Sequence, residues 1–219
     1  MNNTDTLRAV LWDMDGTLID SAEYHWLSWR DMLAAEGRPI THDEFVATFG
    51  QRNDTILRGW FGADLPDAEV MRLADMKEAR YRELVRERGI ELLPGARQWL
   101  ERLHREGWRQ AVASSAPLEN IHTILDVLQI EPFFDALVSA EDVQRGKPDP
   151  QVFLLAAARV GVPPARSIVV EDAPAGVEAG RRAGMRTIGV RSTHRDLTAD
   201  IIVDTLDQLP DDAFERLLD

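Results

Sequence analysis

The sequence predicts an α/β protein in which a doubly wound parallel sheet carries an inserted α-helical domain. Short, bounded apolar segments alternate with segments of helical length and pattern, which is typical of a parallel sheet with helices on both faces. The alternation stops between the first and second apolar segments, where roughly 70 residues show helical patterning without a convincing strand. These two observations define the predicted fold class.

Each predicted strand is a short apolar run that ends beside polar or turn-forming residues. The first run is RAVLWD, whose length and composition suit a strand that is buried on both faces. Four later runs have the same character, and ADIIV is a candidate for a sixth strand at an edge of the sheet. The predicted strands are residues 8–13, 108–114, 135–139, 166–171, 185–190 and 199–203.

Helix start and stop signals divide the inserted segment. The first predicted helix follows a capping residue, Ser21, and ends at Gly37, with large apolar residues on one face. A shorter helix opens at Thr41, and a long, charge-rich helix covers residues 67–88 and ends at Gly89. The segment is therefore predicted to be a helical domain.

The predicted domain boundaries follow from this insertion. Residues 1–20 and 92–219 form the sheet-containing core, and residues 21–91 form the helical domain. The two connections between them, residues 19–21 and 92–95, are the expected hinge.

Composition narrows the classes of function. The chain has 219 residues, 44% of them hydrophobic and 29% charged, which fits a globular protein with a sizeable core. Its formal net charge of −13 argues against nucleic acid or an anionic membrane as a partner. There is no cysteine, so disulfides, thiolate zinc sites and cysteine nucleophiles are excluded. We expect a cytoplasmic protein, since no signal peptide or membrane span is evident.

Polar side chains gather where the predicted strands end. Prolines after these ends mark helix starts, whose free N–H groups suit a phosphate. Because the carboxyl ends of parallel strands meet at one edge of a sheet, these side chains should lie together. The set is Asp13, Asp15, Thr17, Ser114, Lys147, Glu171 and Asp172.

This set predicts a divalent cation. Four acids alone would repel a phosphate, whereas magnesium takes hard oxygen ligands from carboxylates, water and substrate phosphate. In this arrangement Asp13 and Asp172 share the ion with the substrate's oxygens, Lys147 neutralises further charge, and Ser114 donates a hydrogen bond to a phosphoryl oxygen. Ser115 is adjacent, and either serine is also a candidate helix cap.

Four motifs, in this order, resemble the signature motifs of the haloacid dehalogenase superfamily. They are DMDGT at residues 13–17, the strand-ending Ser114, the lysine of GKPDP, and the pair Glu171 and Asp172. Any one motif is weak, and DMDGT alone is also a common strand-ending turn, but the shared order is specific. AEYH at 22–25, GQR at 50–52, LPG at 93–95 and GKPDP at 146–150 further resemble the subgroup of sugar-phosphate phosphatases and β-phosphoglucomutase.

The resemblance implies a magnesium-dependent phosphatase for a small phosphate monoester, in particular a sugar phosphate. Asp13 would attack the phosphorus and form an aspartyl-phosphate, and Asp15 would serve as general acid and then base. The implied catalytic residues are Asp13, Asp15, Thr17, Ser114 and Lys147, and the implied metal site comprises Asp13, Asp15 through its carbonyl, Asp172 and Glu171 in a supporting role. The helical domain would be a cap that closes over the site, and a monomer would leave it a free edge.

Substrate contacts and the outcome of the reaction are left open by the residues. His25, Arg52 and Lys77 match cap positions that face the substrate in the mutase branch, and Ser115 is a core candidate. The three cap residues favour the alternative of a β-phosphoglucomutase. Against it, Ala116, Pro117 and Leu118 replace the Ser-Lys-Asn stretch that holds a second phosphate in the mutases, so we expect a phosphatase. A phospho-aspartate signalling module, or a catalytically inactive binding protein, explains the motif order less well.

Overall fold

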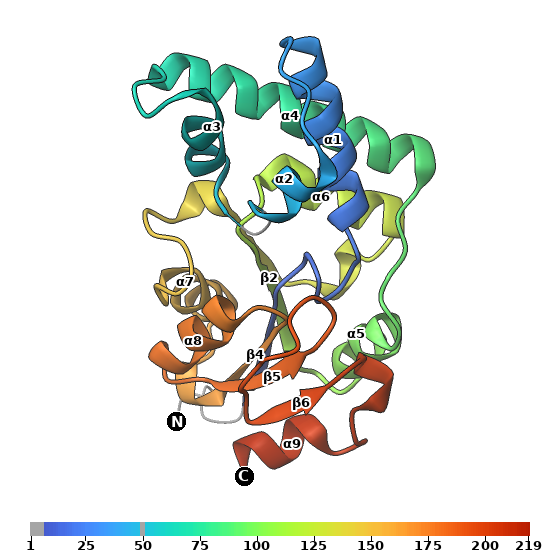
Figure 1. Cartoon of the computed structure of the whole chain (residues 1–219). Coiled ribbons are helices and arrows are strands. Elements are labelled where there is room, and N and C mark those ends of the chain that lie inside the picture. Colours follow the sequence, from blue (N-terminus) through green and yellow to red (C-terminus); the bar gives the residue numbers. More distant parts are fainter. Residues whose placement is uncertain (1–6, 49–50) are drawn as a thin grey trace. The chain divides into compact units, whose positions relative to one another are not determined.

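The computed structural model describes residues 7–48 and 51–219 (Figure 1). The strands are β1 (Ala9–Trp12), β2 (Arg109–Ala113), β3 (Ala136–Val138), β4 (Ser167–Glu171), β5 (Arg186–Val190) and β6 (Ile201–Val203). The α-helices are α1 (Ala22–Ala35), α2 (His42–Val46), α3 (Asn53–Phe61), α4 (Asp67–Arg88), α5 (Ala96–Arg105), α6 (Leu118–Leu128), α7 (Gln151–Val160), α8 (Pro174–Arg182) and α9 (Ala213–Leu218). Short 3-10 helices cover Glu131–Phe133, Ala140–Asp142, Pro164–Arg166 and Leu206–Gln208.

The strands form one six-stranded sheet in the order β3-β2-β1-β4-β5-β6, and every pairing is parallel. The predicted parallel sheet is confirmed, including the edge strand β6. The chain runs from the central β1 outward to β2 and β3, and then returns to the other side of β1 as β4. This reversal creates a switch point at the carboxyl end of β1, where open α/β sheets bind their ligands.

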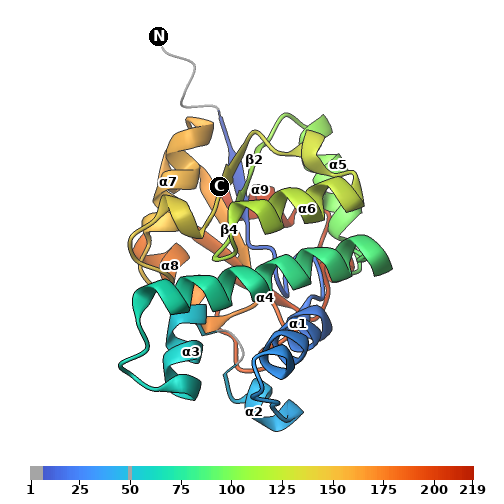
Figure 2. The same cartoon turned by 90° about the horizontal axis from the view of Figure 1, so that it is seen from above.

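Helices cover both faces of the sheet because its strands are apolar on both sides. Ala9 and Leu11 pack into a core with α7 and α8, while Trp12 points to the opposite face and its ring lies 6.2 Å from that of Phe214 in α9. Figure 2 shows α7 and α8 on one side of the sheet and α5 and α6 on the other. Trp12 Nε1 also donates to the side chain of Gln110 (3.0 Å), so the buried indole keeps a hydrogen-bond partner.

The chain forms two compact units. One contains the described residues up to Asp20 together with Ile90–Asp219, and the other is Ser21–Gly89. Within the first unit, the segments that lead to and from the second are joined by a hydrogen bond from Leu93 N to the Leu18 carbonyl (2.8 Å). Among the described residues, no helix has the length and apolar character needed to cross a bilayer.

The helical unit has its own apolar core between α1, α3 and α4. Trp29, Leu33, Leu57 and Leu73 are buried there, and the ring of Trp60 packs edge-on against that of Trp29 at 5.2 Å. Burying each leucine side chain contributes about 1.5–3 kcal/mol to the stability of the fold. The amphipathic pattern of the sequence therefore serves packing within the unit.

The predicted helix signals hold at most positions. Thr41 forms a capping box with Glu44, and Gly37 and Gly89 end their helices with φ of 73° and 72°. Ser21 precedes α1, but its side chain makes no capping hydrogen bond, because its ψ of 0° departs from the extended backbone that a cap requires.

Helix α3 was not predicted. Its cap position holds Arg52, which is not a typical capping residue, although Asp54 in its first turn and Gly62 at its end, with φ of 115°, suit a helix. The first residue of the GQR motif, Gly50, lies outside the described residues.

Candidate active site

Three buried carboxylates meet at the carboxyl ends of β1 and β4. Asp13 follows β1, Glu171 ends β4, and Asp172 is the next residue. Asp13 stays in the sheet's register because its N–H donates to the Val170 carbonyl (3.0 Å). One oxygen from each carboxylate lies within 4.8 Å of the others. This is the edge of the sheet that contains the switch point.

Lys147 bridges two of these acids. Its Nζ lies 2.5 Å from Asp13 Oδ1 and 2.7 Å from Glu171 Oε1, and 5.0 Å from the ring centre of Phe153. Burial disfavours the charged ammonium, but the two carboxylates outweigh it and hold the pKa of Lys147 above its usual value. Lys147 is therefore a fixed positive charge in the site.

One lysine does not balance three acids. Burial, and the charges of Glu171 and Asp172, raise the pKa of Asp13 well above its usual value against the opposing effect of Lys147. Burial and the neighbouring Glu171 also raise the pKa of Asp172 to about 7. Such a site gains from a further cation, and its donors are the hard oxygens that magnesium prefers. The residues present therefore fit a divalent cation.

Hydroxyl donors and a glycine enclose the Asp172 carboxylate. Thr17 Oγ1 donates to Oδ1 (3.4 Å), and Thr193 Oγ1 donates to Oδ2. Gly16 has φ of 82°, and a Cβ built at this position would overlap the Asp172 carboxylate. Glycine is required here both by backbone conformation and by the close approach of the acid.

Glu171 is held in the same way from the other side. Its Oε1 accepts from Lys147, and its Oε2 accepts from the N–H of Ala173 (2.7 Å). A Cβ at Gly176 of α8 would overlap the Glu171 side chain. Because each oxygen of Glu171 already accepts a hydrogen bond, the side chain is oriented by the protein.

Asp15 lies in the turn after Asp13. The turn is closed by hydrogen bonds from Gly16 N to the Ile19 carbonyl (2.7 Å) and from Leu18 N to the Met14 carbonyl (2.9 Å). The side chain of Asp15 is partly exposed and is outside the buried group of three carboxylates. The two aspartates of the motif therefore have different environments.

The helical unit contains a second polar cluster. Lys77 Nζ lies 2.8 Å from Glu78 Oε1 and 2.9 Å from His25 Nδ1, and Asn53 donates to Glu78 Oε1 (2.7 Å). The His25 ring stacks on Tyr81 with centres 4.5 Å apart. This cluster, which we call the helical-unit cluster, contains one lysine and one carboxylate.

A model of the haloacid dehalogenase-like hydrolase family matches residues 7–184. The chain belongs to this family. The resemblance carried by the four motifs is thereby confirmed, and relatives within the family include both phosphatases and a mutase.

Two curated relatives of the chain represent these activities. The chain is 34% identical over 203 residues to β-phosphoglucomutase of Bacillus subtilis, covering 90% of this chain and 89% of the relative. It is 32% identical over 216 residues to hexitol phosphatase B of Escherichia coli K12, covering 95% and 97%.

A solved structure of similar fold is also found. CbbY from Rhodobacter sphaeroides, in complex with phosphate, has a TM-score of 0.84 and 26% identity, covering 93% of this chain and 96% of that one. The chain thus has the fold of this hydrolase family.

The structure brings together some of the predicted site residues. Asp13, Lys147, Glu171, Asp172 and Thr17 form one connected group in the core unit. His25 and Lys77 are in contact within the helical unit. Arg52 instead pairs with Asp54 (3.3 Å), on the exposed surface of that unit.

The two serines after β2 differ. Ser114 is buried, its N–H donates to the Val138 carbonyl (3.0 Å), and its Oγ accepts from Ala116 N (3.0 Å), whereas Ser115 is exposed. Neither is a helix cap, because α6 starts at Leu118 with Pro117 in the cap position. The suggestion that one of them caps the helix was wrong.

Sequence reasoning missed Ser192, Thr193, Glu78 and Asn53. The first two follow β5, so the rule that polar residues after a strand face the site, applied to this strand, would have indicated them. Glu78 and Asn53 carry no such signal, because only the packing of α3 against α4 brings them together.

Proposed function

We propose that the protein is a magnesium-dependent phosphatase that hydrolyses a small phosphate monoester, in particular a sugar phosphate, through an aspartyl-phosphate. The observation that carries the proposal is the contact of Lys147 with Asp13 inside a buried group of three acids at the sheet's switch point. A carboxylate that is held by a lysine and accompanied by surplus negative charge suits a nucleophile that works beside a cation. Phosphatases among the relatives support the proposal.

Each residue has a role in this proposal. Asp13 attacks the phosphorus, the bond from phosphorus to the ester oxygen breaks, and Asp15 gives its proton to the leaving alkoxide. Water then attacks the phosphorus, its proton passes to Asp15, and the bond to Asp13 breaks. Lys147 orients Asp13, and Ser114 donates to a phosphoryl oxygen. Magnesium, when held by Asp13, the Asp15 carbonyl and Asp172, would neutralise the charge of the phosphoryl oxygens, with Glu171 orienting its water.

The partly exposed position of Asp15 supports its proposed role. A carboxyl that both gives and takes a proton needs access to the leaving group and to water, whereas a nucleophile needs fixed geometry. Asp13 has that geometry through Lys147, and Asp15 lies outside the buried acids. The two aspartates are thus suited to different steps.

We also propose that residues 21–89 are a cap that selects the substrate, with His25, Arg52 and Lys77 as contributing side chains. The hydrogen bond that joins the two connecting segments, between Leu93 and Leu18, supports a common hinge. Ser115 is the proposed contact from the core.

A second candidate is a β-phosphoglucomutase, which returns the phosphoryl group to the sugar. The relative from Bacillus subtilis and the presence of His25 and Lys77 favour it. One observation argues against it. The N–H of Leu118 at the start of α6 donates to the Glu141 carboxylate (3.1 Å), so an acid occupies the region where the mutases hold a second phosphate. A bisphosphate would meet negative charge there.

The decisive experiment is an assay of phosphate release from a panel of phosphorylated sugars and nucleotides, with and without magnesium. We expect release only with magnesium, and a loss of at least about 1,000-fold in Asp13→Asn with the fold retained. Undiminished release by Asp13→Asn would rule out the nucleophile. With β-glucose 1-phosphate and a trace of its bisphosphate, glucose 6-phosphate forming faster than free phosphate would establish the mutase instead.

Asp15→Asn separates the two aspartates. With an aryl phosphate, whose leaving group needs no proton, this variant should still form the aspartyl-phosphate and then hydrolyse it slowly. Asp13→Asn should form none. Mass spectrometry of the quenched protein measures the difference, and equal absence of the phosphoenzyme in both would contradict the division of roles.

A further inference from the structure

The acid site lies at the ends of β1 and β4, in the middle of the sheet. Lys147 belongs to the chain segment after β3, on one side of these two strands, and the segment after β5 comes from the other side. Gly189 of β5 pairs with Glu171 of β4, so the residues that follow Val190 leave the sheet at the same edge as Asp172. None of the sequence motifs includes this segment. In the structure it contributes two hydroxyl groups, Ser192 and Thr193.

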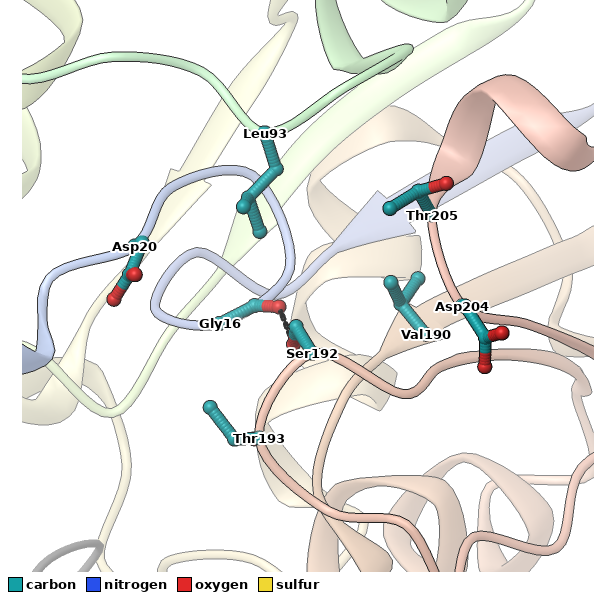
Figure 3. A pocket seen from close by; sticks show the side chains of 8 residues that line it. All are labelled: Gly16, Asp20, Leu93, Val190, Ser192, Thr193, Asp204 and Thr205. Carbon is teal, nitrogen blue, oxygen red and sulfur yellow. Dashed lines mark hydrogen bonds between the residues drawn. The ribbon is translucent and has the colours of Figure 1, made fainter.

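These hydroxyls contact two different loops of the site. Thr193 Oγ1 donates to Asp172 Oδ2, and Ser192 Oγ donates to the carbonyl of Gly16, the residue after Asp15. Figure 3 shows Ser192 bonded to Gly16, with Thr193 beside it, at the wall of a small cavity of about 190 Å³. One short segment therefore ties the β4 loop and the β1 loop together.

The segment is fixed at both ends. On one side Arg191 N donates to the Val203 carbonyl (2.9 Å) of β6. On the other, Leu197 is buried, and a Cβ at Gly189 would overlap its side chain, which shows how closely the returning chain packs on β5. The two hydroxyls are consequently held at the site by the sheet itself.

We propose that Ser192 and Thr193 are positioning residues for the cation site, which fix the Asp172 carboxylate and the loop that carries Asp13 and Asp15. The inference rests on the proposed function, since it assumes that a divalent cation binds there. Thr17 and Thr193 each donate to one oxygen of Asp172, so together they set the rotation of the carboxylate while each oxygen keeps a lone pair for a cation.

The expected effect is on affinity for the cation. Removing a group that donates a hydrogen bond to a metal ligand typically lowers the metal affinity about 10–100-fold. Thr193→Val removes the hydroxyl and keeps the shape, and should weaken binding about tenfold. Thr193→Ser keeps the hydroxyl and should restore most of the affinity. Ser192→Ala, which releases the Gly16 carbonyl, should weaken binding less.

The test is a titration of the full-length protein with Mn2+, followed by the electron paramagnetic resonance signal of the free ion, and with Mg2+ by calorimetry. Thr205→Val is the matched control, because Thr205 lines the same cavity and, within the described chain, has no hydrogen bond to Asp172 or Gly16. It should bind as the wild type does. Thermal unfolding checks that each variant is folded.

The outcomes distinguish this inference from the proposed function. Wild-type affinity in Thr193→Val, or equal weakening in Thr193→Val and Thr205→Val, overturns the positioning role and leaves the phosphatase proposal standing. If Thr193→Val does not fold, Ser192→Ala decides, and unchanged binding in that variant overturns the inference. A wild-type protein that binds neither ion overturns the cation-dependent function, and the inference with it.

Discussion

Each unit of the chain contains a lysine that is paired with a glutamate, and the two clusters differ in their balance of charge. In the core unit, Lys147 contacts Asp13 and Glu171, and Asp172 adds a third buried carboxylate. In the helical unit, Lys77 pairs with one carboxylate of the described chain, that of Glu78, and it also contacts His25, while Asn53 donates to Glu78.

The pKa values follow this difference. In the core, burial and like charge raise the pKa of Asp172 to about 7. In the helical unit, burial also disfavours the Glu78 carboxylate, but the charges of Lys77 and His25 outweigh it and lower the pKa of Glu78. A buried cluster with surplus acid needs a further cation, whereas a balanced cluster is satisfied by its own residues. The same type of ion pair can thus serve a metal site or a helix contact.

The largest effect should come from removing each lysine in metal-free protein. Lys147→Met removes the ion pairs that Lys147 makes with Asp13 and Glu171, and breaking a buried ion pair typically costs about 3–5 kcal/mol. Lys77→Met leaves only Glu78, which retains its hydrogen bond from Asn53 and should cost less. Thermal unfolding in EDTA, monitored by circular dichroism, measures both. A smaller loss in Lys147→Met would show that the core acids are not in surplus.

Isosteric removal of a glutamate sharpens the comparison. Glu78→Gln leaves the charge of Lys77 without its carboxylate, and we expect the free energy of unfolding to fall by about 3 kcal/mol. Glu171→Gln removes one of several negative charges around Lys147, so relief of repulsion offsets part of the lost pairing and the cost should be smaller. Urea unfolding in EDTA compares the two variants. The reverse ranking would contradict the assigned charge balance.

Magnesium should stabilise the wild type through the core cluster alone. At about 100 times its dissociation constant, a ligand that binds only the folded state stabilises it by about 2.7 kcal/mol. Asp172→Asn should abolish this stabilisation, whereas Glu78→Gln should keep it in full because the helical-unit cluster takes no part. Unfolding temperatures with magnesium and with EDTA give the answer. A shift that survives in Asp172→Asn would place the ion elsewhere.

Much of the fold could be predicted from the sequence, because apolar runs and helix ends are local signals. All of the predicted strands are present, and α4 covers the predicted residues 67–88. Helix α3 was missed because its cap position holds Arg52, which is not a typical capping residue. Local chemistry thus indicates elements where they carry their own boundary residues.

The site was predictable to a lesser degree. Asp13 and Glu171 follow from their places at strand ends, and the parallel sheet then brings them together. The pairing of Lys77 with Glu78 could not be predicted, because adjacent residues on a helix do not face each other. The contact of Thr193 with Asp172 depends on the path of the chain after β5, which no motif of the sequence describes.

The two clusters should also differ in how their contribution to stability depends on pH. Because the pKa of Asp172 is raised from 3.8 to about 7, the folded metal-free protein holds a proton that the unfolded chain loses near pH 4. Stability from this residue therefore falls as pH rises across this window, by at most about 1.4 kcal/mol per pH unit. Glu78, with its lowered pKa, contributes stability that is present above its usual value of 4.5 and is lost as pH falls below it.

Urea unfolding in EDTA between about pH 5 and pH 7 tests this, with the wild type compared against each variant. Asp172→Asn should make the decline with pH shallower and leave the part that comes from Asp13, whose pKa is also raised. Glu78→Gln should leave the decline unchanged, because Glu78 is already ionised throughout that range. Magnesium should also remove the decline, since the cation favours the ionised carboxylate. An identical pH profile in the wild type and Asp172→Asn would show that Asp172 is not held protonated by its buried neighbours, and the contrast between the two clusters would then rest on geometry alone.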